Sequence, residues 1–346
     1  MRSYFDSREV QSYGALVNLT LSDRSDGKTF DIKVKGFQRY VKEKKQYVYL
    51  RRWKSEITCD MYETFYNEVI DKVENGKFVG DDDVKDILNY DFLGTKRGVY
   101  IRKKGEERWD LLCYFMPLTM TGKKKSMLDI TRISNIEYDE FVPLDARYVK
   151  SEMHLLMEFY KSVDRDRDCT LLNLYGNRID NFNPFFDFFD IHLGIQKEKI
   201  RLYKDNTIAV QIYMNKEHRE VRSKSRFNSM VKGTTYEEYN DGGVLNQSII
   251  KIGNTNGCWY FASFKSCLGE GSIFINNKQI VVSSKLRKDG DLLVDKIYNT
   301  GRNEYLITFG NLPMLFKSKA KCGQIYYDKE STYHLFEPLL NKIGGM

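Results

Sequence analysis

Short apolar runs alternate with helical patterns through the first 200 residues, and this alternation constrains the fold more than any other feature of the 346-residue chain. Helical spacing of apolar residues covers residues 30–41, 61–73 and 149–163. Strand-like runs cover residues 14–21, 47–50, 111–116, 133–139 and 171–174. Strands that alternate with helices favour a mostly parallel sheet with helices on both faces. The sequence therefore predicts an α/β domain over residues 1–200.

The alternation of strand-like and helical patterns ends after about residue 200. Residues 201–246 are polar, mix both charges and contain several glycines, so we expect a linker there. Beyond it, short strand-like runs separated by Gly and Asn predict a smaller β-rich α+β domain over residues 247–346, closed by a helix at 333–341. The runs are residues 248–252, 259–264, 273–275, 280–282, 292–294 and 305–309.

Composition and charge narrow the class of protein. With 41% hydrophobic and 30% charged residues, the chain fits an ordinary globular protein with a normal core. The net charge of +7 falls mainly after residue 246, which indicates a polyanionic partner for that part or a solvated basic surface. No run reaches the roughly 18 apolar residues that span a bilayer, so no membrane association is expected.

The six cysteines are scattered and form no CxxC pair. Metal-binding and disulfide frameworks need close or paired spacings, so neither is predicted. Residues 1–12 are polar and lack the apolar stretch of a secretory signal. These features favour a reduced, cytosolic protein.

A Gly-Lys-Thr sequence stands at residues 27–29, between the first predicted strand and the first predicted helix. In a phosphate-binding loop, backbone N–H groups surround the phosphates, a lysine reaches the β- and γ-phosphates, and a hydroxyl binds Mg²⁺. Ser22 departs from this pattern, which places a glycine there, and two aspartates add negative charge. The alternative is an ordinary strand–turn–helix corner. The predicted nucleotide-binding residues are Ser22, Asp23, Arg24, Ser25, Asp26, Gly27, Lys28 and Thr29.

Polar side chains close the fourth and fifth predicted strands. An NTPase needs one carboxylate to hold Mg²⁺ and often a second one to activate the attacking water. Ligands bind at the carboxyl edge of a parallel sheet, so Asp139 is predicted to hold Mg²⁺ together with Thr29, and Glu140 to act as the base. Asn177 is a candidate for positioning the water or sensing the γ-phosphate. Solvated turns are the alternative for both positions.

Three charged runs are further candidates. Residues 164–168 alternate in sign after a predicted helix, and a subunit in a ring can supply an arginine to its neighbour's phosphates. Residues 102–104 and 123–125 are basic and could contact nucleic-acid phosphates without reading sequence. Solvated surfaces are the alternative for each of these runs.

Taken in order, these segments resemble the DNA-packaging ATPases of small tailed phages of the phi-29-like group. The resemblance covers most of the chain and is strongest between about 13 and 190. The segments that carry it are residues 47–54 with their paired arginines, residues 136–141, Asn177 with the Asn-Pro-aromatic turn at 183–186, and residues 226–236.

The resemblance implies an ASCE-type P-loop NTPase domain followed by a vestigial RNase H-like nuclease domain. It implies a motor subunit that binds ATP and Mg²⁺ and moves double-stranded DNA into a procapsid. The resemblance also implies that the subunits form a homo-oligomeric ring, a pentamer, and that the ring binds the portal and a prohead RNA. The implied location is the host cytoplasm, transiently at the portal vertex.

The resemblance also assigns residue roles. Lys28 corresponds to the phosphate lysine, Asp139 to the Mg²⁺ carboxylate and Glu140 to the water-activating base. Arg165 falls where the family has its trans-acting arginine finger, with the nearby Arg167 as the alternative. Lys125 falls on a lysine implicated in trans at the subunit interface.

Two expectations concern what the chain does not do. Residues 247–346 show no obvious set of metal-binding carboxylates, with Asp328 and Glu330 as the nearest candidates, so no nuclease activity is expected. The departure at Ser22 leaves a second hypothesis open, a nucleic-acid-binding phage assembly protein with a degenerate nucleotide site. Hydrolysis of Mg-ATP separates the two hypotheses.

Overall fold

The computed structural model describes residues 5–77, 82–124, 128–143, 147–177, 184–191, 199–215, 220, 224–232, 252–321 and 324–344. By their contacts the residues form two compact units. The first contains residues 1–178 and 198–242, and the second contains residues 179–197 and 243–346. The described residues 184–191 therefore group with the second unit, although the sequence predicts them in the first domain.

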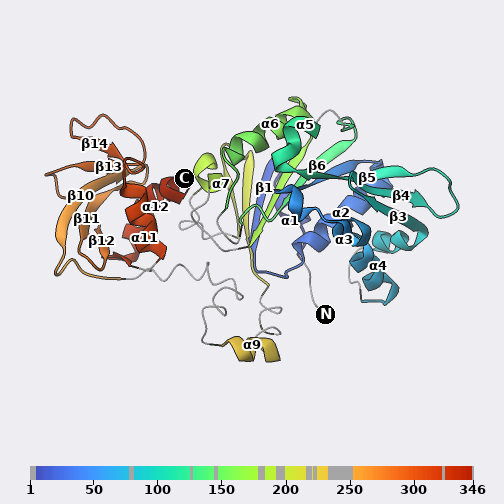
Figure 1. Cartoon of the computed structure of the whole chain (residues 1–346), viewed down its shortest axis with the longest axis horizontal. Coiled ribbons are helices and arrows are strands. Elements are labelled where there is room, and N and C mark those ends of the chain that lie inside the picture. Colours follow the sequence, from blue (N-terminus) through green and yellow to red (C-terminus); the bar gives the residue numbers. More distant parts are fainter. Residues whose placement is uncertain are drawn as a thin grey trace. The chain divides into compact units, whose positions relative to one another are not determined.

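In the described part of the first unit, nine strands form one sheet in the order β3-β4-β5-β2-β6-β7-β1-β9-β8 (Figure 1). The strands from β5 to β9 in this order are parallel, whereas β3, β4 and β8 join by antiparallel pairs. The mostly parallel sheet confirms the predicted α/β class. The strands are β1 (Val17–Ser22), β2 (Gln46–Arg51), β3 (Tyr90–Thr95), β4 (Gly98–Lys103), β5 (Asp110–Pro117), β6 (Ile133–Asp139), β7 (Leu171–Asn177), β8 (Ile200–Tyr203) and β9 (Ile208–Tyr213).

Helices cover both faces of this sheet, as predicted. Helices α2, α3 and α4 lie on one face, and α5 and α6 lie on the other (Figure 1). The helices are α1 (Arg8–Gln11), α2 (Lys28–Glu43), α3 (Cys59–Thr64), α4 (Asn67–Glu74), α5 (Thr121–Lys124), α6 (Glu152–Asp164) and α9 (Arg226–Val231), with short 3₁₀ turns η1 (Lys54–Glu56), η2 (Asp82–Asn89) and η3 (Leu118–Met120). In the residues that the structure describes, none of the helices combines the length and apolar character needed to cross a bilayer.

Helix α2 packs closely against β2, and this packing fixes the position of the loop at its amino end. Phe30, Val34 and Phe37 are buried against the sheet, as their spacing predicts. Gly36 faces the Tyr47 ring, where an added Cβ would lie only 2.3 Å from the ring carbon Cε1. Because any larger side chain would push the helix outward, the close approach depends on this glycine.

Several elements differ from the sequence prediction. The helix expected over residues 61–73 is two helices, α3 and α4, which are separated by Phe65 and Tyr66. Both rings are buried in the core, and their interior packing overrides the continuous helical pattern. The hairpin of β3 and β4 includes Arg102 and Lys103, so the basic segment at 102–104 is largely strand instead of loop.

The segment expected to be a linker from residue 201 begins with two strands of the main sheet. Strand β9 pairs with β1 along its whole length, and residues 208–210 are buried. The apolar run is only a few residues long and lies between polar turns, so its burial is decided by contact with β1 and not by local pattern.

In the described part of the second unit, a six-stranded mixed sheet has the order β14-β13-β10-β11-β12-β15. Helix α12 packs across the central strands and supplies much of a separate apolar core, and α7 packs against α12. The strands are β10 (Trp259–Ser266), β11 (Gly269–Ile275), β12 (Ile280–Ser283), β13 (Leu292–Val294), β14 (Glu304–Leu306) and β15 (Ile325–Tyr327), and the helices are α7 (Pro184–Phe189), α11 (Leu312–Lys321) and α12 (Glu330–Gly344).

The predicted β-rich α+β character of this unit is confirmed. The runs at 259–264, 273–275, 280–282 and 292–294 lie inside strands, and the predicted closing helix lies inside α12. The run at 305–309 contributes only its start to a strand. Most of the run at 248–252 lies outside the described residues.

Candidate nucleotide-binding site

The loop between β1 and α2 is shaped by its own side chains. Residues 23–27 form it, and Gly27 takes a left-handed conformation (φ 96°) that favours glycine, directly before α2 begins. The buried Asp26 carboxylate accepts a hydrogen bond from the Asp23 backbone N–H (3.1 Å). The Asp26 carbonyl accepts another from the N–H of Phe5 (3.1 Å). The aspartate that looked unfavourable beside phosphates therefore holds the loop together.

The Lys28 side chain folds back over this loop. Its Nζ donates to Ser22 Oγ (2.7 Å), to the Asp23 carbonyl (3.0 Å) and to Asn177 Oδ1 (3.0 Å). Burial lowers the pKa of Lys28 to about 8, although the neighbouring carboxylates act in the opposite direction. The structure thus brings together the lysine, the Ser22 that replaces the usual glycine, and Asn177 from the end of β7.

Thr29 and Asp139 meet at the amino end of α2. The Thr29 hydroxyl donates to Asp139 Oδ2 at 2.8 Å, and the buried Tyr49 hydroxyl donates to the same oxygen at 2.7 Å. Hydroxyl and carboxylate oxygens suit Mg²⁺, which prefers hard oxygen ligands. Adjacent oxygens around an octahedral Mg²⁺ with bonds of about 2.1 Å lie about 3 Å apart, so this pair fits one ion.

Glu140 follows Asp139 in a left-handed conformation (φ 59°) that turns its side chain toward β2. Its Oε2 accepts a hydrogen bond from Arg51 Nη2 at 2.7 Å. Arg51 also lies 3.7 Å from Asp139 Oδ2 and 3.6 Å from Glu56 Oε1. The end of β2 therefore controls the electrostatic surroundings of both predicted acids.

The next residue, Arg52, points to the other face of the sheet and holds the segment after β6. Its guanidinium is buried and pairs with Glu152 at 2.9 Å. It also donates to the carbonyls of Glu140 (3.1 Å) and Phe141 (2.6 Å). Because a buried ion pair with filled hydrogen bonds has one good geometry, this network fixes the backbone that carries Glu140.

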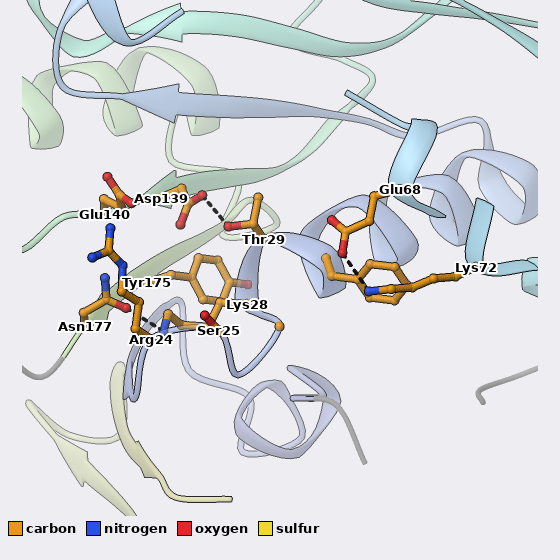
Figure 2. A pocket seen from close by; sticks show the side chains of 12 residues that line it. Arg24, Ser25, Lys28, Thr29, Glu68, Lys72, Asp139, Glu140, Tyr175 and Asn177 are labelled. Atoms are coloured by element: carbon orange, nitrogen blue, oxygen red, sulfur yellow. Dashed lines mark hydrogen bonds and ion pairs between the residues drawn. The ribbon is translucent and has the colours of Figure 1, made fainter. Parts of the chain in front are cut away.

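A cavity of about 320 Å³ opens beside the loop (Figure 2). Glu140 and Asn177 lie at one end of it, while Glu68 and Lys72 from α4 lie at the other and pair with each other at 2.6 Å. The cavity is lined by Arg24, Ser25, Gly27, Lys28, Thr29, Phe30, Glu68, Lys72, Asp139, Glu140, Tyr175 and Asn177. The predicted phosphate, metal and base residues thus face one space.

The candidate arginines lie elsewhere. Helix α6 carries the chain from the edge where β6 ends to the opposite edge, where β7 begins, so Arg165 lies away from the cavity of its own chain. Arg165 is exposed, and although its backbone N–H donates to the Lys161 carbonyl (2.9 Å), its side chain makes no hydrogen bond or ion pair within the described residues. The Arg167 guanidinium instead donates to the carbonyls of Val163 and Ile130 (both 2.9 Å) and of Asp164 (2.8 Å).

Other predicted candidates have different outcomes. Lys125 lies outside the described residues. Arg102 pairs with Asp91 at 2.9 Å. Asp328 accepts hydrogen bonds from Ser283 Oγ (2.8 Å) and the Ser284 N–H (3.0 Å). Within the described ranges, no group of three or more His, Cys, Asp and Glu residues could hold a metal ion.

Six residues at the site were not among the predicted site residues: Phe30, Tyr49, Arg51, Glu68, Lys72 and Tyr175. Tyr49 and Arg51 are two residues apart in β2, so their side chains point to the same face of the sheet. This spacing, next to the end of the strand, could have indicated that both side chains reach the site. Glu68 and Lys72 sit on α4 and gave no signal, because only the packing of α4 near α2 brings them to the cavity.

The mostly parallel sheet with helices on both faces defines an α/β protein, and the loop lysine, the loop threonine and the strand-end acid form its candidate nucleotide-binding site. The family assignment is more specific. Residues 2–255 match the family described as Podovirus DNA encapsidation protein (Gp16), and the chain belongs to this family.

Individual relatives agree with this assignment. The DNA packaging proteins of Bacillus phages PZA and phi29 are each 24% identical to this chain over 237 residues, which is 68% of this chain and 64% of theirs. The matched region therefore spans less than two thirds of the length of these relatives. The DNA packaging protein of Bacillus phage B103 is 24% identical over 244 residues, 70% of this chain and 68% of its own.

Solved structures show the same fold. The Phi-28 gp11 DNA packaging motor aligns with a TM-score of 0.54 at 15% identity, over 99% of this chain and 98% of that one. The bacteriophage Phi-29 viral genome packaging motor assembly aligns with a TM-score of 0.54 at 17% identity, over 98% and 99%. At such identities the likeness concerns the fold alone.

Proposed function

We propose that this chain is the ATP-hydrolysing subunit of a motor that drives double-stranded DNA into a phage procapsid. The observation that carries the proposal is the cavity in which Lys28, the Thr29–Asp139 pair and Glu140 face one another. Because the chain belongs to a DNA encapsidation family, we infer that ATP hydrolysis at this site would power DNA packaging.

The phosphate and metal roles follow from the contacts. Lys28 would exchange its present acceptors for the β- and γ-phosphates, and Asn177 would stay beside the γ-phosphate. Thr29 and Asp139 would hold Mg²⁺, which neutralises charge that develops on the phosphates. Tyr49 would keep Asp139 oriented from behind.

Glu140 would act as the general base. It would accept a proton from the water that attacks the γ-phosphorus, while the ADP oxygen leaves on the opposite side. Arg51 binds only the Oε2 atom of Glu140, so the other carboxylate oxygen would accept the proton.

The remaining roles involve neighbouring molecules. We propose that Arg165 acts in trans on the phosphates of the next subunit in a homo-oligomeric ring, a pentamer, and that Lys125 contributes at the same interface. Support for Arg165 comes from its exposure and its distance from its own cavity. The ring would work at the portal vertex in the host cytoplasm, with the basic second unit contacting prohead RNA or portal.

ATP turnover with and without double-stranded DNA tests the proposal. Removing a general base costs about 10²- to 10⁴-fold, so Glu140→Gln should lower turnover by about 100-fold or more. Binding of Mg-ATP should persist in this variant, because the Lys28 and Asp139 contacts remain.

One observation favours the alternative of a nucleic-acid-binding assembly protein with a degenerate nucleotide site. The Asp23 N–H is already bound by Asp26, and Lys28 already has three acceptors, so the loop is satisfied by itself. This alternative predicts no turnover of Mg-ATP and a salt-dependent affinity for DNA that is the same with and without nucleotide. Both results together would contradict the proposed motor function.

A further inference from the structure

The loop after α6 has a strained backbone. Arg165, Asp166 and Asp168 all take left-handed conformations, with φ of 53°, 57° and 53°. Arg165 occupies the C-cap of α6, a position where glycine is the usual left-handed residue. Non-glycine residues in this region cost free energy and persist only where the surroundings fix them. The residues around the loop must therefore hold Arg165 in this backbone conformation.

Asp164 holds the loop from inside. Its Oδ1 accepts the N–H groups of Cys169 (3.1 Å) and Thr170 (2.9 Å), and its Oδ2 accepts that of Asp168 (2.9 Å). The side chain is buried, and burial by itself would raise the pKa of Asp164. The backbone hydrogen bonds outweigh burial and hold that pKa below its usual range, so the carboxylate stays charged at neutral pH.

Arg167 closes the same loop from the other direction. Its guanidinium satisfies the carbonyls of Val163 and Asp164 at the end of α6, and it reaches the Ile130 carbonyl before β6. The side chains of Asp164 and Arg167 are thus both bonded to backbone groups. The Arg165 guanidinium is exposed and without a partner among the described residues.

We propose that Asp164 is a positioning residue for Arg165, and that it fixes the 164–170 loop so that Arg165 is presented to a neighbouring subunit. This inference rests on the proposed trans role of Arg165. Because the backbone that carries Arg165 is already fixed, docking of the partner would have to order only the Arg165 side chain, so the rigid loop favours the reaction. Arg167 acts as a second structural support and not as the finger.

Mixed subunits test this inference. Acceptor subunits carry Arg165→Ala and keep a working cavity, whereas donor subunits carry Lys28→Ala and keep Arg165. Mixing the two should restore ATP turnover in the presence of DNA. Donors that also carry Asp164→Ala should lower the restored turnover by about tenfold. Asp164→Asn should have a smaller effect, because the amide oxygen retains part of the acceptor set.

The matched control is Asp166→Asn in the donor, which changes an exposed acid of the same loop and should leave rescue intact. A second arm places Asp164→Ala in the acceptor instead. Rescue should persist there, since the acceptor's own loop supplies no working arginine. We expect Asp164→Ala to lower the restored ATP turnover only when it is placed in the donor subunits.

The outcomes distinguish the two levels of the proposal. No rescue in the basic mixture would overturn the trans role itself, and with it this inference. Full rescue by the Asp164→Ala donor would overturn only the positioning role. Equal losses in the donor and acceptor arms would show that Asp164 merely stabilises the fold, and would also overturn the inference.

Discussion

Lys28 is the site residue whose ionisation matters most for nucleotide binding. Burial lowers the pKa of Lys28 to about 8. Phosphates would favour the charged form and raise this pKa again. As the pH rises through about 8, Lys28 loses its charge, so above this pH nucleotide binding would take up a proton.

Nucleotide binding just above pH 8 should therefore take up protons, and affinity should fall as pH rises further. Calorimetric titration in buffers of different ionisation enthalpy measures this uptake. Lys28→Arg is the control, since an arginine stays protonated throughout this range. Equal apparent enthalpies for the natural protein in all buffers would contradict the prediction.

Tyr49 supplies a second prediction at the residue scale. Tyr49→Phe removes the hydroxyl that donates to Asp139 Oδ2, and loss of such outer support typically costs about 10-fold or more in metal affinity. Mg²⁺ titration of a fluorescent nucleotide complex should show the loss, while metal-free nucleotide binding stays unchanged. Tyr47→Phe is the control, because its hydroxyl bonds to Tyr66 in the core. Equal behaviour of the two variants would refute a specific role for Tyr49.

At the scale of elements, the contact between α2 and β2 sets where the phosphate loop sits. Gly36→Ala would place a methyl group 2.3 Å from the Tyr47 ring. Overpacking of this kind costs about 1–3 kcal/mol, so the urea midpoint should fall. Gly122→Ala is the control, since its added Cβ meets nothing within 4 Å. An unchanged midpoint in Gly36→Ala would mean that α2 shifts without cost.

Elements with strong local patterns were predicted well. Helix α2 and strands β2, β5 and β6 formed close to their expected ranges, because apolar periodicity over many residues is a local property. Strand β9 and the break between α3 and α4 were not predicted. Both depend on burial against distant residues, which no local pattern records.

At the scale of the whole molecule, the contacts of Asp328 in the second unit argue against nuclease activity. The Asp328 carboxylate accepts from Ser283, Ser284 and the Thr332 hydroxyl. These bonds outweigh burial, which alone would raise the pKa of Asp328, and hold that pKa below its usual range. This carboxylate therefore supports the start of α12 and is not presented to a metal ion.

We expect no DNA cleavage with Mg²⁺ or Mn²⁺. Asp328→Ala should instead lower the free energy of unfolding by about 1–3 kcal/mol, because buried donors lose their acceptor. Thermal unfolding and a plasmid cleavage assay measure the two effects. Asp291→Ala, at an exposed position, is the stability control. Cleavage that disappears in Asp328→Ala would contradict this prediction.

The sequence by itself determined the α/β class, the lysine-bearing loop before α2 and the acids that close β6, since each is written in a few adjacent residues. Only the tertiary structure decided that Tyr49 and Arg51 hold those acids, that Asp26 supports the loop, and where Arg165 points. These contacts join residues far apart in the chain or depend on the exact backbone path of a turn. They arise from strand order, register and packing, which the whole chain settles together.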